Sequence, residues 1–358
     1  MPTHLASLGS LVHPHQMEIQ EFASYALVID ARSAGAYQED HVPGAVSVPI
    51  AATPLFSEQD SSLTGDPAPP TGKPGPSLPD ALAVHTQGLS AGDAILVYCD
   101  RGGLDSMVWA APLRSAGFQV DVLGGGWINY RRWVSAGLEL LPRVLTFRPL
   151  LAPPVSGLCR VLDLLVRQGE QVIDLAALAG QRLVPGLTLQ GDEPPSQLAF
   201  ETALLNAMRH LDPQRQVWLR DGIAGLGGLT LPPSLRDALQ RSKCVTLEVP
   251  LPVRALAWFE RLQAMNTSIA ALLQAFSASA LPPPSKVLEQ SRALANAGQV
   301  TDALATIIRG YIDPRSASLL ASAKVEVIRL ASLKADAVGA VVNGWLGSDA
   351  TGVPNRTT

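Results

Sequence analysis

Short apolar segments that alternate with helix-like segments constrain the fold of this chain most strongly. Segments 25–30 (YALVID) and 94–99 (AILVYC) have the length and residue types of buried strands, and each precedes a loop and helix-like sequence. The alternation returns after Pro142, in segments 143–169, 216–222 and 244–250, with Ser196 a suitable N-cap for an intervening helix. Strands that are apolar throughout are typical of a parallel sheet covered by helices. The sequence therefore predicts an α/β fold.

Chain length and composition favour more than one domain. The 358 residues, 47% of them hydrophobic, suffice for two globular domains with ordinary cores. We place the boundary near Leu140, with a first domain at 1–140 and a second α/β domain at 141–280. Residues 281–358 are predicted to form a helical C-terminal extension with a frayed tail. Segment 51–80, rich in Pro, Gly and Ser, is predicted to be a loop.

Net charge and cysteine usage exclude several classes of protein. The formal charge of −4 gives no global positive field for nucleic acid, although a local basic patch is compatible with it. The three cysteines are widely spaced, which argues against a disulfide framework and against a metal site, so no metal is expected. There is no apolar run of about 18 residues and no signal-peptide pattern. We expect a cytoplasmic protein without membrane contact and leave its oligomeric state open.

The segment VYCDRGGLDS places Cys99 at the carboxyl end of a predicted strand, where open parallel sheets meet their ligands. Gly102 and Gly103 allow a tight loop whose N–H groups point inward, and a helix is predicted to begin near Ser106. Such surroundings lower the pKa of a thiol and hold a persulfide anion. Two interpretations stay open at this point: a nucleophile, or a small buried hydrophobic residue at a strand end.

Residues 28–49 (VIDARSAGAYQEDHVPGAVSVP) resemble the signature of the rhodanese family, in which Asp-x-Arg ends a strand and a His-x-x-Gly-Ala-x-x-x-Pro turn follows. The resemblance implies an α/β domain whose loop cysteine carries sulfur as a persulfide, and Cys99 falls on that position. We interpret Asp30, Arg32 and His41 as structural, because hydrogen bonds that fix a turn explain them adequately.

The cysteine loop, together with GGGWINYRRWV at 124–134, resembles the tRNA 2-selenouridine synthase family more specifically. The matching residues are Cys99, Arg101, Gly102, Gly103, Leu104, Ser106, Gly125, Gly126, Arg131 and Arg132. The family continues with a domain of P-loop type, and later segments here agree with it in order. The resemblance implies that selenium replaces sulfur in the wobble 2-thiouridine of tRNA through a geranylated intermediate, with Cys99 as the chalcogen-handling residue. Selenophosphate and geranyl diphosphate are the implied co-substrates, and no tightly bound cofactor is implied.

The sequence departs from this family at two loops. Asp105 stands where the family has a second arginine, and it joins Asp100 in opposing a low thiol pKa, whereas Arg101 and the backbone N–H groups offset them. In the expected phosphate loop, Val155, Ser156 and Gly157 remain, but Leu158 and Cys159 replace the lysine and hydroxyl that bind phosphate and magnesium. An ordinary ATP site is not expected there. Either the fold survived while its phosphate chemistry was lost, or part of that chemistry remains.

A basic segment with interleaved aromatic residues spans 127–167. Its arginines are at 131, 132, 143, 148, 160 and 167, against Glu139 and Asp163. With Trp127 among the aromatic residues, Arg131, Arg132, Arg143 and Arg148 are candidates for contact with an RNA backbone. Packing and ion pairing between domains explain such a segment equally well.

Three hypotheses about function follow. The first is a transferase of the tRNA 2-selenouridine synthase kind, acting on tRNA through Cys99. The second is a rhodanese-type sulfurtransferase that forms a Cys99 persulfide and ignores tRNA. The third is a non-catalytic binding protein that kept the fold and tolerates loss of the thiol.

Overall fold

The computed structural model describes residues 22–50, 79–180, 194–220, 226, 228–279, 281–315 and 325–349. Two units are distinguished: unit 1 comprises residues 1–137 and 201–203, and unit 2 comprises 138–200 and 204–358. The boundary predicted near Leu140 lies inside one helix, α4 (Gly126–Val144), whose first turns belong to unit 1 and whose last turns belong to unit 2.

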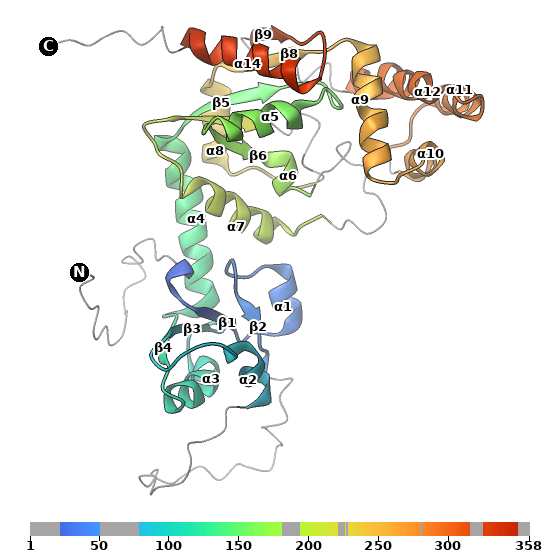
Figure 1. The fold of residues 1–358 in the computed structure, drawn as a ribbon. Helices are drawn as coiled ribbons and strands as arrows, with labels where there is room; N and C mark the ends of the chain where they lie inside the picture. The colour runs from blue at the N-terminus through green and yellow to red at the C-terminus, as the bar shows by residue number, and fades with distance from the viewer. Residues whose placement is uncertain are drawn as a thin grey trace, which may run out of the picture. The chain divides into compact units, whose positions relative to one another are not determined.

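Unit 1 is built on a parallel sheet with the strand order β2-β1-β3-β4 (Figure 1). Its strands are β1 (Leu27–Asp30), β2 (Val46–Ser47), β3 (Ala94–Tyr98) and β4 (Gln119–Val122). Its helices, besides the start of α4, are α1 (Ala34–Glu39), α2 (Asp80–Thr86) and α3 (Leu104–Ser115). β1 and β3 correspond to the first two strands expected from the sequence. Most of the segment expected to be a loop, residues 51–78, lies outside the described residues.

The alternation of side chains between the two faces of the sheet decides on which face Cys99 lies, at the end of β3. Ile95, Val97 and Cys99 belong to one buried cluster with Trp109 and Leu113 of α3. Side chains of a strand point alternately to its two faces, and each such apolar side chain contributes about 1.5–3 kcal/mol on burial. The thiol is therefore held on the α3 side of the sheet, at the carboxyl end of a strand that is anchored on both edges.

Unit 2 contains a second parallel sheet, with the order β6-β7-β5-β8-β9. The strands are β5 (Thr146–Leu151), β6 (Gln171–Asp174), β7 (Gln216–Arg220), β8 (Cys244–Glu248) and β9 (Val325–Arg329). The first strand in sequence, β5, is central, because the chain crosses to β6 on one side and later to β8 on the other. The loop that follows β5 thus lies at a switch in strand order, the usual place for a ligand in an open α/β sheet.

Helices connect these strands and cover the sheet (Figure 1). Those near the sheet are α5 (Leu158–Arg167), α6 (Leu175–Leu178), α7 (Gln197–Met208), α8 (Pro233–Arg241) and α14 (Ala335–Asp349). A second cluster is formed by α9 (Leu251–Ala264), α10 (Ile269–Ala278), α11 (Ser285–Asn296) and α12 (Val300–Ile307), whose core includes Trp258 and Phe276. The expected N-cap is observed: Ser196 Oγ accepts a 3.0 Å hydrogen bond from Ala199 N at the start of α7. Among the described helices, none is long and apolar enough to cross a membrane.

The C-terminal part differs from the expected helical extension. It contributes α11, α12 and α14, but also β9, which pairs in parallel with β8 and so belongs to the sheet of unit 2. The sequence VEVIR mixes charged and apolar residues because β9 is an edge strand with one partner, and Val327 remains 45% exposed. Such a strand lacks the continuous apolar run that marked the central ones.

Candidate active site around Cys99

The loop after β3 is held by the loop that precedes α4. Trp127 N donates to Cys99 O at 2.8 Å, and Ile128 N donates to Asp100 O at 3.1 Å. Leu123 N donates to Val97 O at 3.0 Å, which continues the pairing of β3 with β4. The two segments that resembled one family motif, around Cys99 and around the glycines at 124–126, are therefore hydrogen-bonded neighbours.

Two glycines permit this close approach. Gly126 has φ +54°, and a Cβ on it would lie 2.2 Å from Cys99 O. Gly102 has φ +65°, and a Cβ on it would lie 2.2 Å from Leu123 O. Both obstacles are backbone atoms, which cannot move away as a flexible side chain can. The loops can pack in this way only with glycine at both positions.

We expect Gly126→Ala to separate the two loops and to return the Cys99 thiol to ordinary reactivity, so that its alkylation at neutral pH slows by about tenfold. The measurement is the pH dependence of the alkylation rate of Cys99, resolved by peptide mass spectrometry. Gly88→Ala is the matched control, because Gly88 also has a positive φ, +87°, but a Cβ there meets no atom within 4 Å. Equal rates in both variants would contradict this role of Gly126.

The Cys99 thiol is buried among hydrogen-bond donors of the loop that follows β3. The residue is only 3% exposed. Burial by itself raises the pKa of the Cys99 thiol, but the Ser106 hydroxyl and the backbone N–H groups of Gly103, Arg101 and Gly102 lower it, and the net result is a lowered pKa. The Ser106 hydroxyl is fully buried, and within the described residues no partner other than Cys99 is found for it. It can therefore donate to a thiolate or to an anion carried on Cys99.

The loop that follows Cys99 also carries exposed side chains. Asp100, Arg101, Leu104 and Asp105 all reach solvent, and Leu104 at the first position of α3 is 87% exposed. Of the residues predicted for the anion-binding loop, Arg101, Gly102, Gly103 and Ser106 supply donors to the Cys99 thiol, and no such contact is found for Leu104. The two aspartates do not prevent a lowered thiol pKa, because neutral N–H and O–H donors next to the sulfur lower it.

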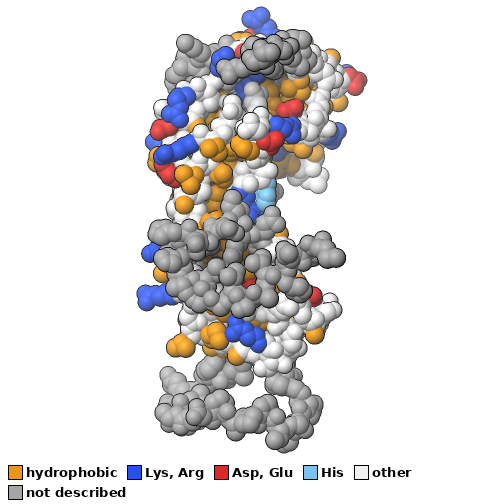
Figure 2. All heavy atoms as spheres, turned by 90° about the vertical axis from the view of Figure 1, so that its left-hand side faces the viewer, with side chains coloured by type: hydrophobic (Ala, Val, Ile, Leu, Met, Phe, Trp, Pro, Cys, Tyr) orange, Lys and Arg blue, Asp and Glu red, His pale blue; other side chains and the backbone are white. Residues whose placement is uncertain are grey.

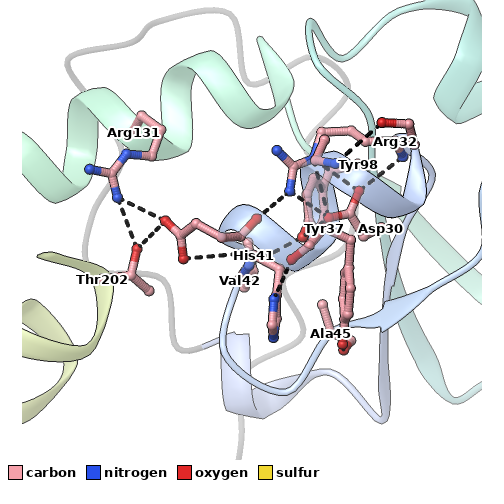
Figure 3. Close-up of polar contacts among 12 residues, drawn as sticks. Asp30, Arg32, Tyr37, His41, Val42, Ala45, Tyr98, Arg131 and Thr202 are labelled. Carbon is pink, nitrogen blue, oxygen red and sulfur yellow. Dashed lines mark hydrogen bonds and ion pairs between the residues drawn. The ribbon is translucent and has the colours of Figure 1, made fainter. Parts of the chain in front are cut away.

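A buried ion pair fixes the strand ends beneath the site (Figure 3). Asp30 accepts hydrogen bonds from Arg32 Nη2 at 2.7 Å and from the Tyr98 hydroxyl at 2.6 Å, and all three residues are almost fully buried. Arg32 also donates to the carbonyl oxygen of Asp40 at 2.6 Å. His41 Nδ1 lies 2.9 Å from the carbonyl oxygen of Tyr37, on whose ring it stacks. These contacts give the Asp30, Arg32 and His41 side chains structural partners.

The RNA-contact candidates of unit 1 differ in how much they are engaged within the protein. The Trp127 ring packs on the Arg32 guanidinium at 3.8 Å. Arg131, labelled in Figure 3, pairs with Asp40 at 3.0 Å. Arg132 is exposed, with one 3.3 Å hydrogen bond to Asn129. Of these three, Arg132 is the most open to an external phosphate.

The candidates of unit 2 are Arg143 and Arg148. Arg143 is exposed and pairs with Glu139 one helical turn away. Arg148, on β5, pairs with Glu326 at 2.6 Å and packs over the Trp218 ring. On the part of the face in Figure 2 that is not grey, Lys and Arg side chains lie among apolar and acidic ones.

The loop after β5 does not fit a phosphate or a magnesium-bound nucleotide. Ser156 is buried, and its hydroxyl donates to the Pro153 carbonyl at 2.5 Å. Gly157 has φ +70° and packs against the Leu333 side chain, which a Cβ would meet at 2.7 Å. Leu158 follows as a buried core residue. The loop therefore offers neither a lysine nor a free hydroxyl to a phosphate.

Arg254 binds this loop from inside the protein. It is 4% exposed, donates to the Pro154 carbonyl at 2.8 Å and forms a two-pronged ion pair with Asp313 at 2.7 and 2.9 Å. A cation thus faces a loop carbonyl, whereas a phosphate site presents N–H groups. No sequence pattern signals this contact, because Arg254 and Asp313 lie in unrelated segments.

We expect neither magnesium-ATP nor inorganic pyrophosphate to stabilise the protein. A site with a dissociation constant of about 0.1 mM would add roughly 2 kcal/mol to the free energy of unfolding at about 5 mM ligand. The measurement is the thermal unfolding midpoint with and without each ligand. A concentration-dependent rise that follows this relation would show that the loop after β5 still binds phosphate.

The other two cysteines are half-buried. Cys159 lies in the first turn of α5, with Arg220 Nη1 at 3.4 Å from its sulfur, and Arg220 also pairs with Asp174 at 3.1 Å. Cys244 begins β8 and makes a long 3.7 Å contact to the Ser242 carbonyl.

Comparison with known proteins agrees with this geometry. Residues 16–132 match the family described as rhodanese-like domain. The chain is 32% identical over 164 residues to a tRNA 2-selenouridine synthase of Shewanella sp. (strain MR-7), which covers 45% of this chain and 42% of that protein. It is 33% identical over 161 residues to the tRNA 2-selenouridine synthase of Hahella chejuensis, covering 44% of this chain and 41% of that protein. The matched region is thus less than half the length of these curated relatives.

A parallel sheet that ends in a cysteine loop lined by backbone N–H groups, together with the family match, defines the class: unit 1 is a rhodanese-like domain. Within that class, the matched region is similar to curated tRNA 2-selenouridine synthases, in agreement with the resemblance of its cysteine loop and its glycine-arginine segment.

Proposed function

We propose that this protein replaces sulfur by selenium in the wobble 2-thiouridine of tRNA and that Cys99 carries the chalcogen. The set of hydrogen-bond donors around Cys99 is the observation that supports this most directly. Three backbone N–H groups and the Ser106 hydroxyl surround one sulfur. These donors suit a thiolate before loading and a terminal persulfide or perselenide after it.

The residues around the Cys99 thiol have distinct roles in this proposal. The Cys99 thiolate attacks the outer sulfur of a sulfane donor such as thiosulfate, an S–S bond forms, and sulfite leaves with the electron pair. Selenide, which forms together with phosphate when the P–Se bond of selenophosphate is hydrolysed, then attacks the Cys99 Sγ of this persulfide. The S–S bond breaks, hydrosulfide leaves, and selenium stays on Cys99 as a perselenide. The N–H groups of residues 101–103 and the Ser106 hydroxyl then stabilise the anion on Cys99. Gly102 and Gly126 keep the loop in the conformation that aims these donors inward.

The co-substrates in this proposal come from the family resemblance. Selenophosphate is the selenium donor, and geranyl diphosphate supplies the alkyl group that activates the 2-thio position. We do not assign the diphosphate to the loop at 152–157, where Arg254 and Leu333 occupy the positions next to the backbone.

Contact with tRNA is proposed through exposed arginines. Arg132 lies in α4, the helix that begins beside the Cys99 loop, and Arg143 follows in the same helix. Both are exposed, whereas Arg131 and Arg148 are largely engaged in ion pairs. Guanidinium groups bind phosphates through paired hydrogen bonds, and such binding weakens as salt concentration rises.

The test is nucleoside mass spectrometry of 2-thiouridine tRNA after incubation with the full chain, selenophosphate and geranyl diphosphate. A second reaction starts from tRNA that is already S-geranylated, which separates selenium transfer from geranylation. Formation of 2-selenouridine in both reactions supports the whole proposal. Formation only from the geranylated tRNA confines the activity to the chalcogen step, and no product in either reaction would refute the proposal.

A rhodanese-type sulfurtransferase is the second candidate. Two observations favour it: the family match covers only residues 16–132, and the loop after β5 does not fit phosphate. This candidate predicts that Cys99 gains sulfur from thiosulfate and passes it to a small thiol, while the tRNA nucleosides stay unchanged in both reactions.

A further inference from the structure

We propose that Trp127 is a positioning residue for the Cys99 thiol: its backbone holds the cysteine loop, and the buried Arg32 guanidinium holds its ring. The inference deepens the proposed function and rests on Cys99 being the reactive group of that proposal. It gives the Trp127 side chain a role in reactivity, and it gives Arg32 a second role besides its ion pair with Asp30.

The backbone at Trp127 and Ile128 binds two successive carbonyl groups of the cysteine loop. Trp127 N donates to Cys99 O at 2.8 Å, and Ile128 N donates to Asp100 O at 3.1 Å. These two residues therefore determine how the peptide groups that follow Cys99 are oriented.

The bond to the Asp100 carbonyl acts on the thiol through one peptide group. The Asp100 carbonyl and the Arg101 N–H belong to the same planar trans peptide group, so they point in opposite directions. Ile128 N binds the carbonyl on one side, and the Arg101 N–H donates to the Cys99 sulfur on the other. A shift of the start of α4 would turn this peptide group and move the N–H away from the sulfur.

The Trp127 ring is anchored on a buried cation. The guanidinium carbon of Arg32 lies 3.8 Å from the ring centroid, and the Arg32 side chain is 2% exposed. Hydrogen bonds to the Asp30 carboxylate at 2.7 and 3.0 Å and to the Asp40 carbonyl at 2.6 Å fix this guanidinium (Figure 3). A cation over the face of an indole attracts the ring, and the attraction is stronger where water is excluded.

Two further observations connect this anchor with the cysteine loop. The ring of Tyr98, the residue before Cys99, stacks on the Trp127 ring with 6.2 Å between centroids and 20° between planes. Burial by itself lowers the pKa of the Arg32 guanidinium, but its hydrogen bond to Asp30 and the charge of Asp100 are among the causes that raise it. Arg32 therefore stays charged over the whole range in which a thiol titrates.

The test is the pH dependence of the alkylation of Cys99 by iodoacetamide. In this reaction the Cys99 thiolate forms a C–S bond and iodide leaves. Rates are measured on the full chain and resolved at Cys99 by peptide mass spectrometry, with Cys99→Ser as the blank. Trp127→Leu keeps an apolar side chain but removes the flat ring, whereas Trp127→Phe restores a flat ring that can stack on Arg32.

We expect Trp127→Leu to slow alkylation at neutral pH by about fivefold and to move the rate profile to higher pH, because fewer donors stabilise the thiolate. Well above the midpoint of the profile, where the thiolate is fully formed, the rate is expected to reach at least the wild-type value. Trp127→Phe is expected to stay within about twofold of the wild type at every pH. The charged neighbours in the loop, Asp100, Arg101 and Asp105, are the same in all these proteins.

Trp133→Leu is the matched control. Trp133 is also a half-buried tryptophan of α4, but it packs on Phe22 and Tyr130. This variant is expected to leave the pH profile unchanged, even where it lowers the thermal unfolding midpoint. A profile for Trp127→Leu that coincides with the wild type would overturn the inference, and so would an equal shift in Trp133→Leu or in Trp127→Phe.

Loading with thiosulfate separates this inference from the proposed function. The same thiolate attacks the outer sulfur and sulfite leaves, so Trp127→Leu is expected to slow loading at neutral pH by about the same factor. If residue 127 controls the alkylation profile but Cys99 takes up neither sulfur nor selenium, the inference stands and the proposed function fails. Loading and transfer by Cys99 together with an alkylation profile that is independent of residue 127 would overturn the inference and leave the proposed function standing.

Discussion

Cys99→Ser is expected to abolish chalcogen loading and transfer, with a loss of about a thousandfold or more. A serine hydroxyl at the same position keeps the backbone hydrogen bonds, but it is far less acidic than a thiol and forms no per-chalcogenide. The donors that lower the pKa of the Cys99 thiol would then surround a group that stays protonated. The measurement is the mass of the intact protein after exposure to thiosulfate or selenophosphate, followed by the transfer assay.

Cys244→Ser is the control for this prediction, because Cys244 is half-buried at the start of β8 in unit 2, on a different sheet from Cys99. It is expected to load and transfer at the wild-type rate. If Cys99→Ser retained transfer while Cys244→Ser lost it, the assignment of the chalcogen-carrying residue would be wrong.

Asp30→Ala is expected to lower the free energy of unfolding of unit 1 by about 3–5 kcal/mol, because it leaves the Arg32 guanidinium buried without its counter-ion. The Asp30 carboxylate accepts three further hydrogen bonds, from Arg32 N, Arg32 Nε and the Tyr98 hydroxyl. The side chains of Arg32 and Asp30 are 2% and 0% exposed, so water cannot replace the lost partner. Urea denaturation monitored by tryptophan fluorescence measures the change.

Two variants give this prediction its controls. Asp80→Ala removes an exposed carboxylate from the first turn of α2 and is expected to change the free energy of unfolding by less than about 0.5 kcal/mol. Asp30→Ala combined with Arg32→Met removes both charges and is expected to recover part of the loss. A single variant as stable as the wild type would contradict the structural role assigned to the ion pair.

The central strands and the cysteine site could be predicted from the sequence because their signals are local. β1 and β3 are continuous apolar runs, Ser196 precedes a helical pattern by one residue, and Cys99 directly follows a strand. Each pattern needs only a few neighbouring residues to be read. The resemblance of the two glycine-rich segments to one family then predicted that they act together, and backbone hydrogen bonds join them.

Contacts between distant segments could not be predicted in this way. Arg254 reaches both Pro154 and Asp313, which are 100 and 59 residues away along the chain, and nothing local marks these partners. β9 is amphipathic and pairs with only one strand, so its composition resembled that of a helix or tail. The effect of Asp100 and Asp105 on the thiol pKa could not be predicted from the sequence either, because the donors next to the sulfur determine the direction of the shift.

A single-turnover transfer experiment tests the central claim most directly. The full chain is loaded with an isotopically labelled selenium donor, free donor is removed by gel filtration, and S-geranylated 2-thiouridine tRNA is added, followed by a thiol that releases the product. We predict that label leaves Cys99 and appears in the wobble nucleoside, up to one atom per protein. Label that is released only as a small molecule, with an unlabelled nucleoside, would contradict the claim.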